Sequence, residues 1–140
     1  MAISSHLMAM VFWTAAAAAQ PVEAVVEPVE PIETTVFFDY GRNDLGPAGL
    51  LLVREIASRA LAAGYTKVSI EGHADAAGPE DQNLATGRER AEAVASELIK
   101  AGFRARYVEI KSAGEAKPLR SHEDERSEPL NRRAELIFSP

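Results

Sequence analysis

The chain has 140 residues, enough for about one domain, and its apolar fraction of 46% suffices for one hydrophobic core. Its 15 basic and 21 acidic residues leave a net charge of −6, which repels the nucleic-acid backbone and excludes nucleic acid as an expected partner. The sequence has no cysteine, which excludes disulfides, a thiolate nucleophile, cysteine-ligated metal and a lipid-modified amino-terminal cysteine.

Residues 1–19 have the pattern of a secretory signal peptide. An uncharged apolar core runs from Leu7 to Ala19, and the small residues Ala17 and Ala19 have the spacing that signal peptidase reads. The alternative is an uncleaved anchor, but this core would reach only about 20 Å as a helix, short of a hydrocarbon layer of roughly 30 Å. We therefore expect export, with cleavage after Ala19.

Residues 20–34 are expected to form an extended, Pro/Glu-rich linker. Prolines at 21, 28 and 31 alternate with valines and glutamates, so the segment can neither continue a helix nor bury one face. Much of the acidity of the chain belongs to this spacer, because four glutamates occur in it without a basic residue.

Residues 35–140 are expected to form one domain. Apolar periodicity and turn residues predict strands at 34–39, 67–72, 107–112 and 132–138, and helices at 46–64 and 78–102. The helices would bury the stripes Val53, Ile56, Ala57, Ala60, Leu61 and Leu84, Gly87, Ala91, Val94, Leu98. The order βαβαββ predicts an α+β fold, a mixed α/β sandwich with a four-stranded mixed sheet and both main helices on one face.

Asp75 and Arg90 are the candidate binding residues. Asp75 lies in a loop of small residues that leaves the carboxyl end of the second strand, where ligands usually sit in α/β sheets. Arg90 comes one position before Ala91 of the buried stripe, so it should emerge at the edge of the helix–sheet interface. A carboxylate and a guanidinium could grip a zwitterion. Alternatively, Asp75 caps a turn or the helix, and Arg90 pairs with Glu89, Glu92 or an acidic residue of a loop.

Other polar residues give weaker signals. His73, with Glu71 and Asp75 at alternate positions, suggests a metal or catalytic site, but a structural histidine bonded to backbone is the preferred interpretation. Arg132 and Arg133 are consecutive in a predicted strand, so at most one can face a site near Asp75. We expect no metal, because the sequence shows no set of two histidines and a carboxylate. We also expect no cofactor and no catalytic residues, because it contains no nucleophile elbow, phosphate loop or dinucleotide fingerprint.

Five blocks, in order and spacing, resemble the OmpA-like carboxy-terminal domain, the module of OmpA, peptidoglycan-associated lipoprotein and flagellar stator proteins. They cover residues 34–138 and read "VFFDYGRNDL", "IEGHADAAGPEDQN", "RERAEAVASELIKAG", "SAGEAKP" and "NRRAEL". The resemblance implies non-covalent binding of peptidoglycan through the meso-diaminopimelate of its stem peptide, in the periplasm or cell envelope of a Gram-negative-type bacterium.

The resemblance also implies roles for individual residues. Asp75 and Arg90 would hold the zwitterionic end of diaminopimelate, Asn83 would open the helix block, and the pocket would be bordered by Asp39 to Gly41 and Arg133. The sequence departs from the family pattern at Ala74, where Thr is usual, at Thr86 and Gly87, which replace Leu-Ser, and at Ser112 and Ala113, which replace a Gly-aromatic pair.

The sequence therefore predicts a non-enzymatic cell-wall anchor, with an outer-membrane or envelope protein as a further possible partner. Two alternatives remain: a protein-interaction module that keeps the fold but has lost wall binding, and a peptidoglycan-processing enzyme. An enzyme would need a metal triad or a poised carboxylic acid, and the sequence shows neither.

Overall fold

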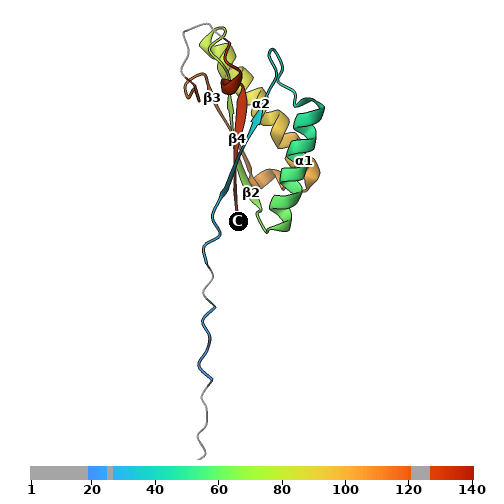
Figure 1. Cartoon of the computed structure of the whole chain (residues 1–140), viewed down its shortest axis with the longest axis vertical. Coiled ribbons are helices and arrows are strands. Elements are labelled where there is room, and N and C mark those ends of the chain that lie inside the picture. Colours follow the sequence, from blue (N-terminus) through green and yellow to red (C-terminus); the bar gives the residue numbers. More distant parts are fainter. Residues whose placement is uncertain (1–18, 25–26, 121–126) are drawn as a thin grey trace, which may run out of the picture.

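The computed structural model describes residues 19–24, 27–120 and 127–140, in which a four-stranded sheet is covered on one face by two helices (Figure 1). The predicted signal peptide, residues 1–19, lies outside this part of the chain except for Ala19. The elements are β1 (Ile32–Phe37), α1 (Gly46–Ala62), β2 (Lys67–His73), α2 (Glu80–Ala101), η1 (Ala105–Tyr107), β3 (Val108–Gly114), η2 (Pro129–Asn131) and β4 (Arg133–Ser139). No helix among the described residues has the length and apolar character needed to cross a membrane.

The strands lie in the order β1-β4-β2-β3. β4 pairs antiparallel with both β1 and β2, whereas β2 pairs parallel with β3. The parallel pair requires a crossover, which α2 supplies. The predicted α+β fold with a mixed sheet and two helices on one face is therefore confirmed.

The core lies between the sheet and the helices. Alternate strand residues such as Ile70 and Leu136 face the helices and are fully buried, as the period of two requires. The predicted helical stripes are largely correct, but Leu84 is exposed. At this point the backbone of α2 contacts β3 directly, because the hydroxyl of Ser112 donates to the carbonyl of Leu84 at 2.7 Å.

β1 spans Ile32–Phe37, whereas the predicted strand spans residues 34–39. The observed strand therefore begins and ends two residues earlier than the predicted one. Ile32 and Glu33, which the sequence assigns to the linker, pair with the last residues of β4. The carbonyl of Glu30 accepts a hydrogen bond from the hydroxyl of Tyr65 at 2.7 Å. The described residues before Ile32 are exposed and carry no helix or strand, and Figure 1 shows them leading away from the sheet.

Helix α2 approaches β2 unusually closely at Gly72 and Gly87. A Cβ atom at Gly72 would overlap the carbonyl of Gly87, and a Cβ atom at Gly87 would overlap the hydroxyl of Ser112 and the carbonyl of Gly72. Gly87 is therefore required for the close packing of α2 on the sheet. The contact places the first half of α2, including Arg90, beside the loop that follows β2.

Candidate functional site

A polar cavity of about 210 Å³ lies where the loops after β1 and β2 meet the first half of α2. Asp75 and Arg90, the predicted binding pair, both line it. Residues from four separate parts of the chain complete the lining: Tyr40, Gly41, Asn43, Ala77, Asn83, Thr86 and Arg132. Of the departures from the family pattern, Thr86 lines this cavity, whereas Ala74 does not.

Asp75 is held by residues that are distant in the sequence. Its side chain is nearly buried, and its Oδ2 atom accepts hydrogen bonds from Ser127 Oγ at 2.9 Å and from Arg132 Nη1 at 3.3 Å. Among the residues that the structure describes, no side chain caps the amino end of α2, so the interpretation of Asp75 as a helix cap is wrong. No described residue donates to Oδ1, which leaves that oxygen available to a ligand.

Arg90 is buried, with only 3% of its surface exposed, and its guanidinium is fixed by backbone carbonyls. Nη1 donates to the carbonyl of His73 at 2.9 Å, while Nε and Nη2 donate to the carbonyl of Arg42 at 3.3 and 3.2 Å. The guanidinium carbon also lies 5.4 Å from the centre of the Phe38 ring. Three of the five N–H groups of the guanidinium are thus used within the described protein, and two remain for a ligand.

The electrostatic environment of Arg90 combines burial with charges of both signs. Burial lowers the pKa of Arg90 and the nearby Arg132 adds to this shift, whereas Asp75 opposes it. The alternative pairing with Glu89 or Glu92 is wrong, because Glu89 accepts from Asn43 and Glu92 accepts from Arg88. Arg90 therefore retains a charge that no carboxylate contacts directly in the described residues.

Arg132, and not Arg133, belongs to the cavity. Arg132 donates to Asp75, to Ser127 and to the carbonyl of Phe38. Arg133 instead donates to Glu135 at 2.7 Å and to the carbonyl of Lys117 at 3.1 Å. The prediction that Arg133 borders the pocket is therefore wrong. Arg132 precedes β4, whereas Arg133 is the first residue of β4 and its side chain points to the other face of the sheet.

The other predicted site residues have mixed outcomes. Gly41 lines the cavity in a left-handed conformation, with φ of 68°. Asn83 also lines it, and its amide donates to the carbonyl of Gly78 and to Glu115 Oε2 at 3.1 and 3.0 Å. Asp39 is exposed and is absent from the lining. Tyr40, which lies within the predicted range Asp39 to Gly41, lines the cavity, and the guanidinium carbon of Arg132 lies 5.6 Å from the centre of its ring.

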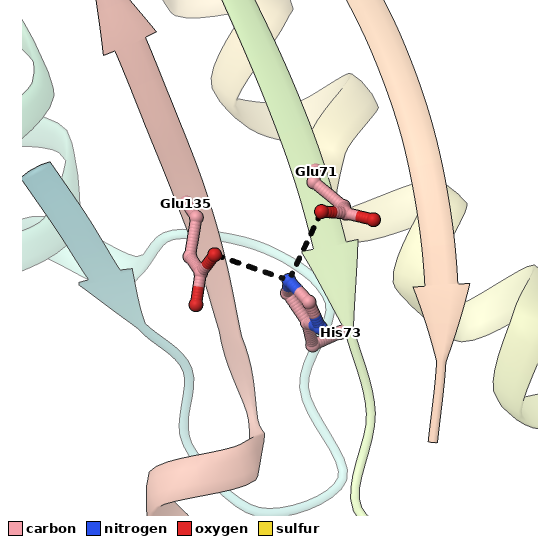
Figure 2. A group of neighbouring side chains, drawn as sticks. All are labelled: Glu71, His73 and Glu135. Carbon is pink, nitrogen blue, oxygen red and sulfur yellow. Dashed lines mark ion pairs between the residues drawn. The ribbon is translucent and has the colours of Figure 1, made fainter. Parts of the chain in front are cut away.

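His73 lies outside the cavity, on the open face of the sheet between two glutamates (Figure 2). Its imidazole is 1% exposed, and neither ring nitrogen has a hydrogen-bond partner among the described residues. The predicted side-chain bond to backbone is therefore wrong, although the His73 carbonyl accepts from Arg90. Burial lowers the pKa of His73, as does Arg133, while Glu135 and Glu71 partly oppose this shift.

Larger hollows lie elsewhere on the domain. One, of about 480 Å³, lies along Lys67–Ser69, Arg106–Glu109 and the end of β4, and another, of about 420 Å³, lies between the start of α1 and the second half of α2. Two more, of about 320 and 240 Å³, lie beside the end of α2 and along β1 and β4. None of these four places a buried carboxylate beside a buried guanidinium. The smaller cavity at Asp75 and Arg90 is therefore the best candidate for recognition of a charged ligand.

The chain is similar in sequence and in fold to known proteins. Peptidoglycan-associated lipoproteins from Pseudomonas putida and Pseudomonas aeruginosa are 35% and 34% identical over 103 residues, covering 74% of this chain and 61% of each relative. The chain thus spans about three fifths of the length of these curated relatives. The crystal structure of the peptidoglycan-associated lipoprotein from Burkholderia pseudomallei matches with a TM-score of 0.67 and 31% identity, over 75% of this chain and 89% of that one.

Three further observations define the relationship. The carboxy-terminal domain of MotB from Helicobacter pylori shares the fold, with a TM-score of 0.67 at 18% identity over 76% of this chain and 84% of that one. The relatives are lipoproteins and outer-membrane proteins, which confirms the predicted location in the periplasm or cell envelope. The model of the OmpA family matches residues 37–132, and with this match across most of its length the chain belongs to the OmpA family.

Proposed function

We propose that this protein binds peptidoglycan non-covalently, by holding the zwitterionic end of meso-diaminopimelate in the cavity between Asp75 and Arg90, and so anchors itself to the cell wall without catalysis. The single observation that carries the proposal is the convergence of these two buried, oppositely charged side chains on one cavity. The names of the relatives support wall binding, and the specificity for diaminopimelate rests on the chemistry of the cavity.

The unused hydrogen-bonding groups match this ligand. Diaminopimelate ends in an ammonium and a carboxylate on one carbon. The ammonium would donate to Asp75 Oδ1, and the carboxylate would accept from the two remaining N–H groups of Arg90. Both protein groups are already positioned by other bonds, so little side-chain entropy is lost on binding.

The volume of the cavity indicates how much of the wall it would enclose. A volume of 210 Å³ is about seven times the ~30 Å³ that one water molecule occupies in the liquid. Pockets that enclose drug-sized ligands hold about 300–1,000 Å³. The cavity therefore suits an amino-acid head group, with the glycan and the rest of the stem peptide outside.

Retention on purified sacculi tests the proposal. Asp75→Ala and Arg90→Ala should each weaken retention of the full chain by about 2 to 5 kcal/mol, because each leaves a buried charge of the ligand unpaired. Asp81→Ala and Arg88→Ala are matched controls, since both residues are exposed on α2 and outside the cavity. The controls should be retained like the unmodified protein.

Competition with small molecules tests the specificity separately. Free meso-diaminopimelate should release the protein from sacculi, whereas Nα-acetyl-L-lysine amide, which has a side-chain ammonium and no carboxylate, should not. Unchanged retention of both Asp75→Ala and Arg90→Ala would contradict the assignment of the site and favour a protein-interaction module. Release of soluble wall fragments by the protein would favour an enzyme.

A further inference from the structure

Glu71, His73 and Glu135 form a compact group on the face of the sheet opposite the helices (Figure 2). Glu71 and His73 come from β2 and Glu135 from β4, where Glu71 and Glu135 are register partners. One ligand atom from each residue lies within 4.8 Å of the other two. We propose that these three residues bind a divalent transition-metal ion, with Zn²⁺ as the representative ion.

The strongest indication is His73, because it is a buried polar side chain without a hydrogen-bond partner. Nδ1 and Nε2 both lack one among the described residues, although the ring is 99% buried. Burying an unsatisfied polar group costs free energy, so such a group calls for an explanation. Nε2 points between the two carboxylates, which is the direction from which a metal ion would satisfy it.

The carboxylates are already oriented for this role. Glu71 accepts from Lys117 Nζ through Oε1 at 2.7 Å, and Glu135 accepts from Arg133 Nε through Oε1 at 2.7 Å. In both residues the other oxygen, Oε2, faces His73 Nε2. Lys117 and Arg133 thus act as the outer hydrogen-bond partners that hold metal-binding carboxylates in place.

The distances suit a metal ion better than a hydrogen bond. Nε2 lies 3.7 Å from Glu135 Oε2 and 4.0 Å from Glu71 Oε2, too far for either hydrogen bond. Ligand atoms bound tetrahedrally at 2.0–2.1 Å from Zn²⁺ lie about 3.3 Å apart. Small movements of the two carboxylates, whose side chains are 25% and 39% exposed, would close the difference. Water would supply the fourth ligand from the solvent side.

Isothermal titration of Zn²⁺ into the full chain, after treatment with a chelator, tests the proposal. The unmodified protein should bind one equivalent, and Glu71→Gln and Glu135→Gln should each weaken binding by about tenfold or more. Glu109→Gln is the matched control. Glu109 is an exposed residue of β3 on the same face of the sheet as the proposed site, and it pairs with Lys111. It should bind Zn²⁺ like the unmodified protein.

The glutamate variants keep the test independent of folding, since both side chains are partly exposed whereas His73 is buried. Absence of saturable binding to the unmodified protein would overturn the proposal. Binding that both glutamate variants retain in full would place the ion elsewhere, for example on His6 or His122, and would also overturn it. Sacculus retention of Glu135→Gln should stay unchanged, so the outcome does not depend on wall binding.

Discussion

Among the residues of the cavity, Arg132 determines how Asp75 is presented. It contacts one carboxylate oxygen and the hydroxyl of Ser127, and the other oxygen of Asp75 stays open. Arg132 also donates to the carbonyl of Phe38, which precedes the loop that carries Tyr40 and Gly41. One guanidinium thus positions both the carboxylate and a wall of the cavity.

Arg132→Met should therefore weaken sacculus retention and destabilise the protein. Removing one member of a largely buried ion pair leaves Asp75 with an uncompensated charge, and we expect a loss of stability on the order of 3 kcal/mol. Arg133→Met is the matched control for retention alone, because Arg133 is also buried but pairs with Glu135 on the opposite face of the sheet. Urea unfolding and sacculus retention measure both effects, and full retention of Arg132→Met would contradict this role.

At this scale the sequence identifies Asp75 and Arg90 but cannot choose between Arg132 and Arg133. Which of the two arginines faces the cavity depends on the residue at which the strand begins, because side chains alternate between the two faces only from that residue on. The strand was expected at Arg132, but β4 begins at Arg133, and Arg132 follows the short η2 turn with φ of −85° and ψ of 80°. Ser127 was not predictable either, since its contact with Asp75 joins residues 52 positions apart.

Among the elements, the position of α2 on the sheet decides whether the cavity exists. Gly72 and Gly87 allow the helix backbone to rest on β2, and Ser112 bonds the same helix from β3. The loop after β2 and the first half of α2 can then share one ligand. A wider helix–sheet separation would move Arg90 away from Asp75.

Gly87→Ala should destabilise the protein even though alanine is favoured by about 1 kcal/mol over glycine inside a helix. The new methyl group would overlap Ser112 Oγ and the Gly72 carbonyl, and we expect a net loss of about 1 to 3 kcal/mol. Gly49→Ala in α1 is the control, because its new methyl group would overlap no atom and would lie 3.2 Å from its nearest neighbour, the Cβ atom of Leu45. A higher urea midpoint for Gly87→Ala would contradict the close contact.

Most elements follow from local periodicity, and the errors occur where tertiary contacts decide. Both helices and the inner strands are predicted to within a few residues. The early start of β1 at Ile32 was missed because Pro31 and the residues before it have the composition of a linker. Composition does not predict that Ile32 pairs with the end of β4. The exposure of Leu84 was missed because a glycine and a serine on β3 contact the helix backbone at that turn.

In the whole molecule, the two helices are joined to each other as well as to the sheet. Glu97 of α2 accepts from Arg54 of α1 at 3.4 Å and from Lys100 at 2.9 Å. The hydrogen bond from Lys100 lowers the pKa of Glu97, and Arg54 contributes in the same direction against the opposing effect of burial. Because Glu97 contacts both helices, its ionisation makes the stability of the protein depend on pH.

Glu97→Gln should lower the stability of the protein at neutral pH and have a smaller effect in acid. Because the folded state lowers the pKa of Glu97, its contribution is complete above the unfolded value of about 4.3 and is lost as the pH falls through the lower folded value. The difference in Tm between the unmodified protein and Glu97→Gln should thus be constant from pH 7 to about 5 and shrink below about 4. Glu92→Gln is the control, since the partner of Glu92 in the described part of the chain is Arg88 on its own helix. A difference that grows on acidification would contradict the link between the helices.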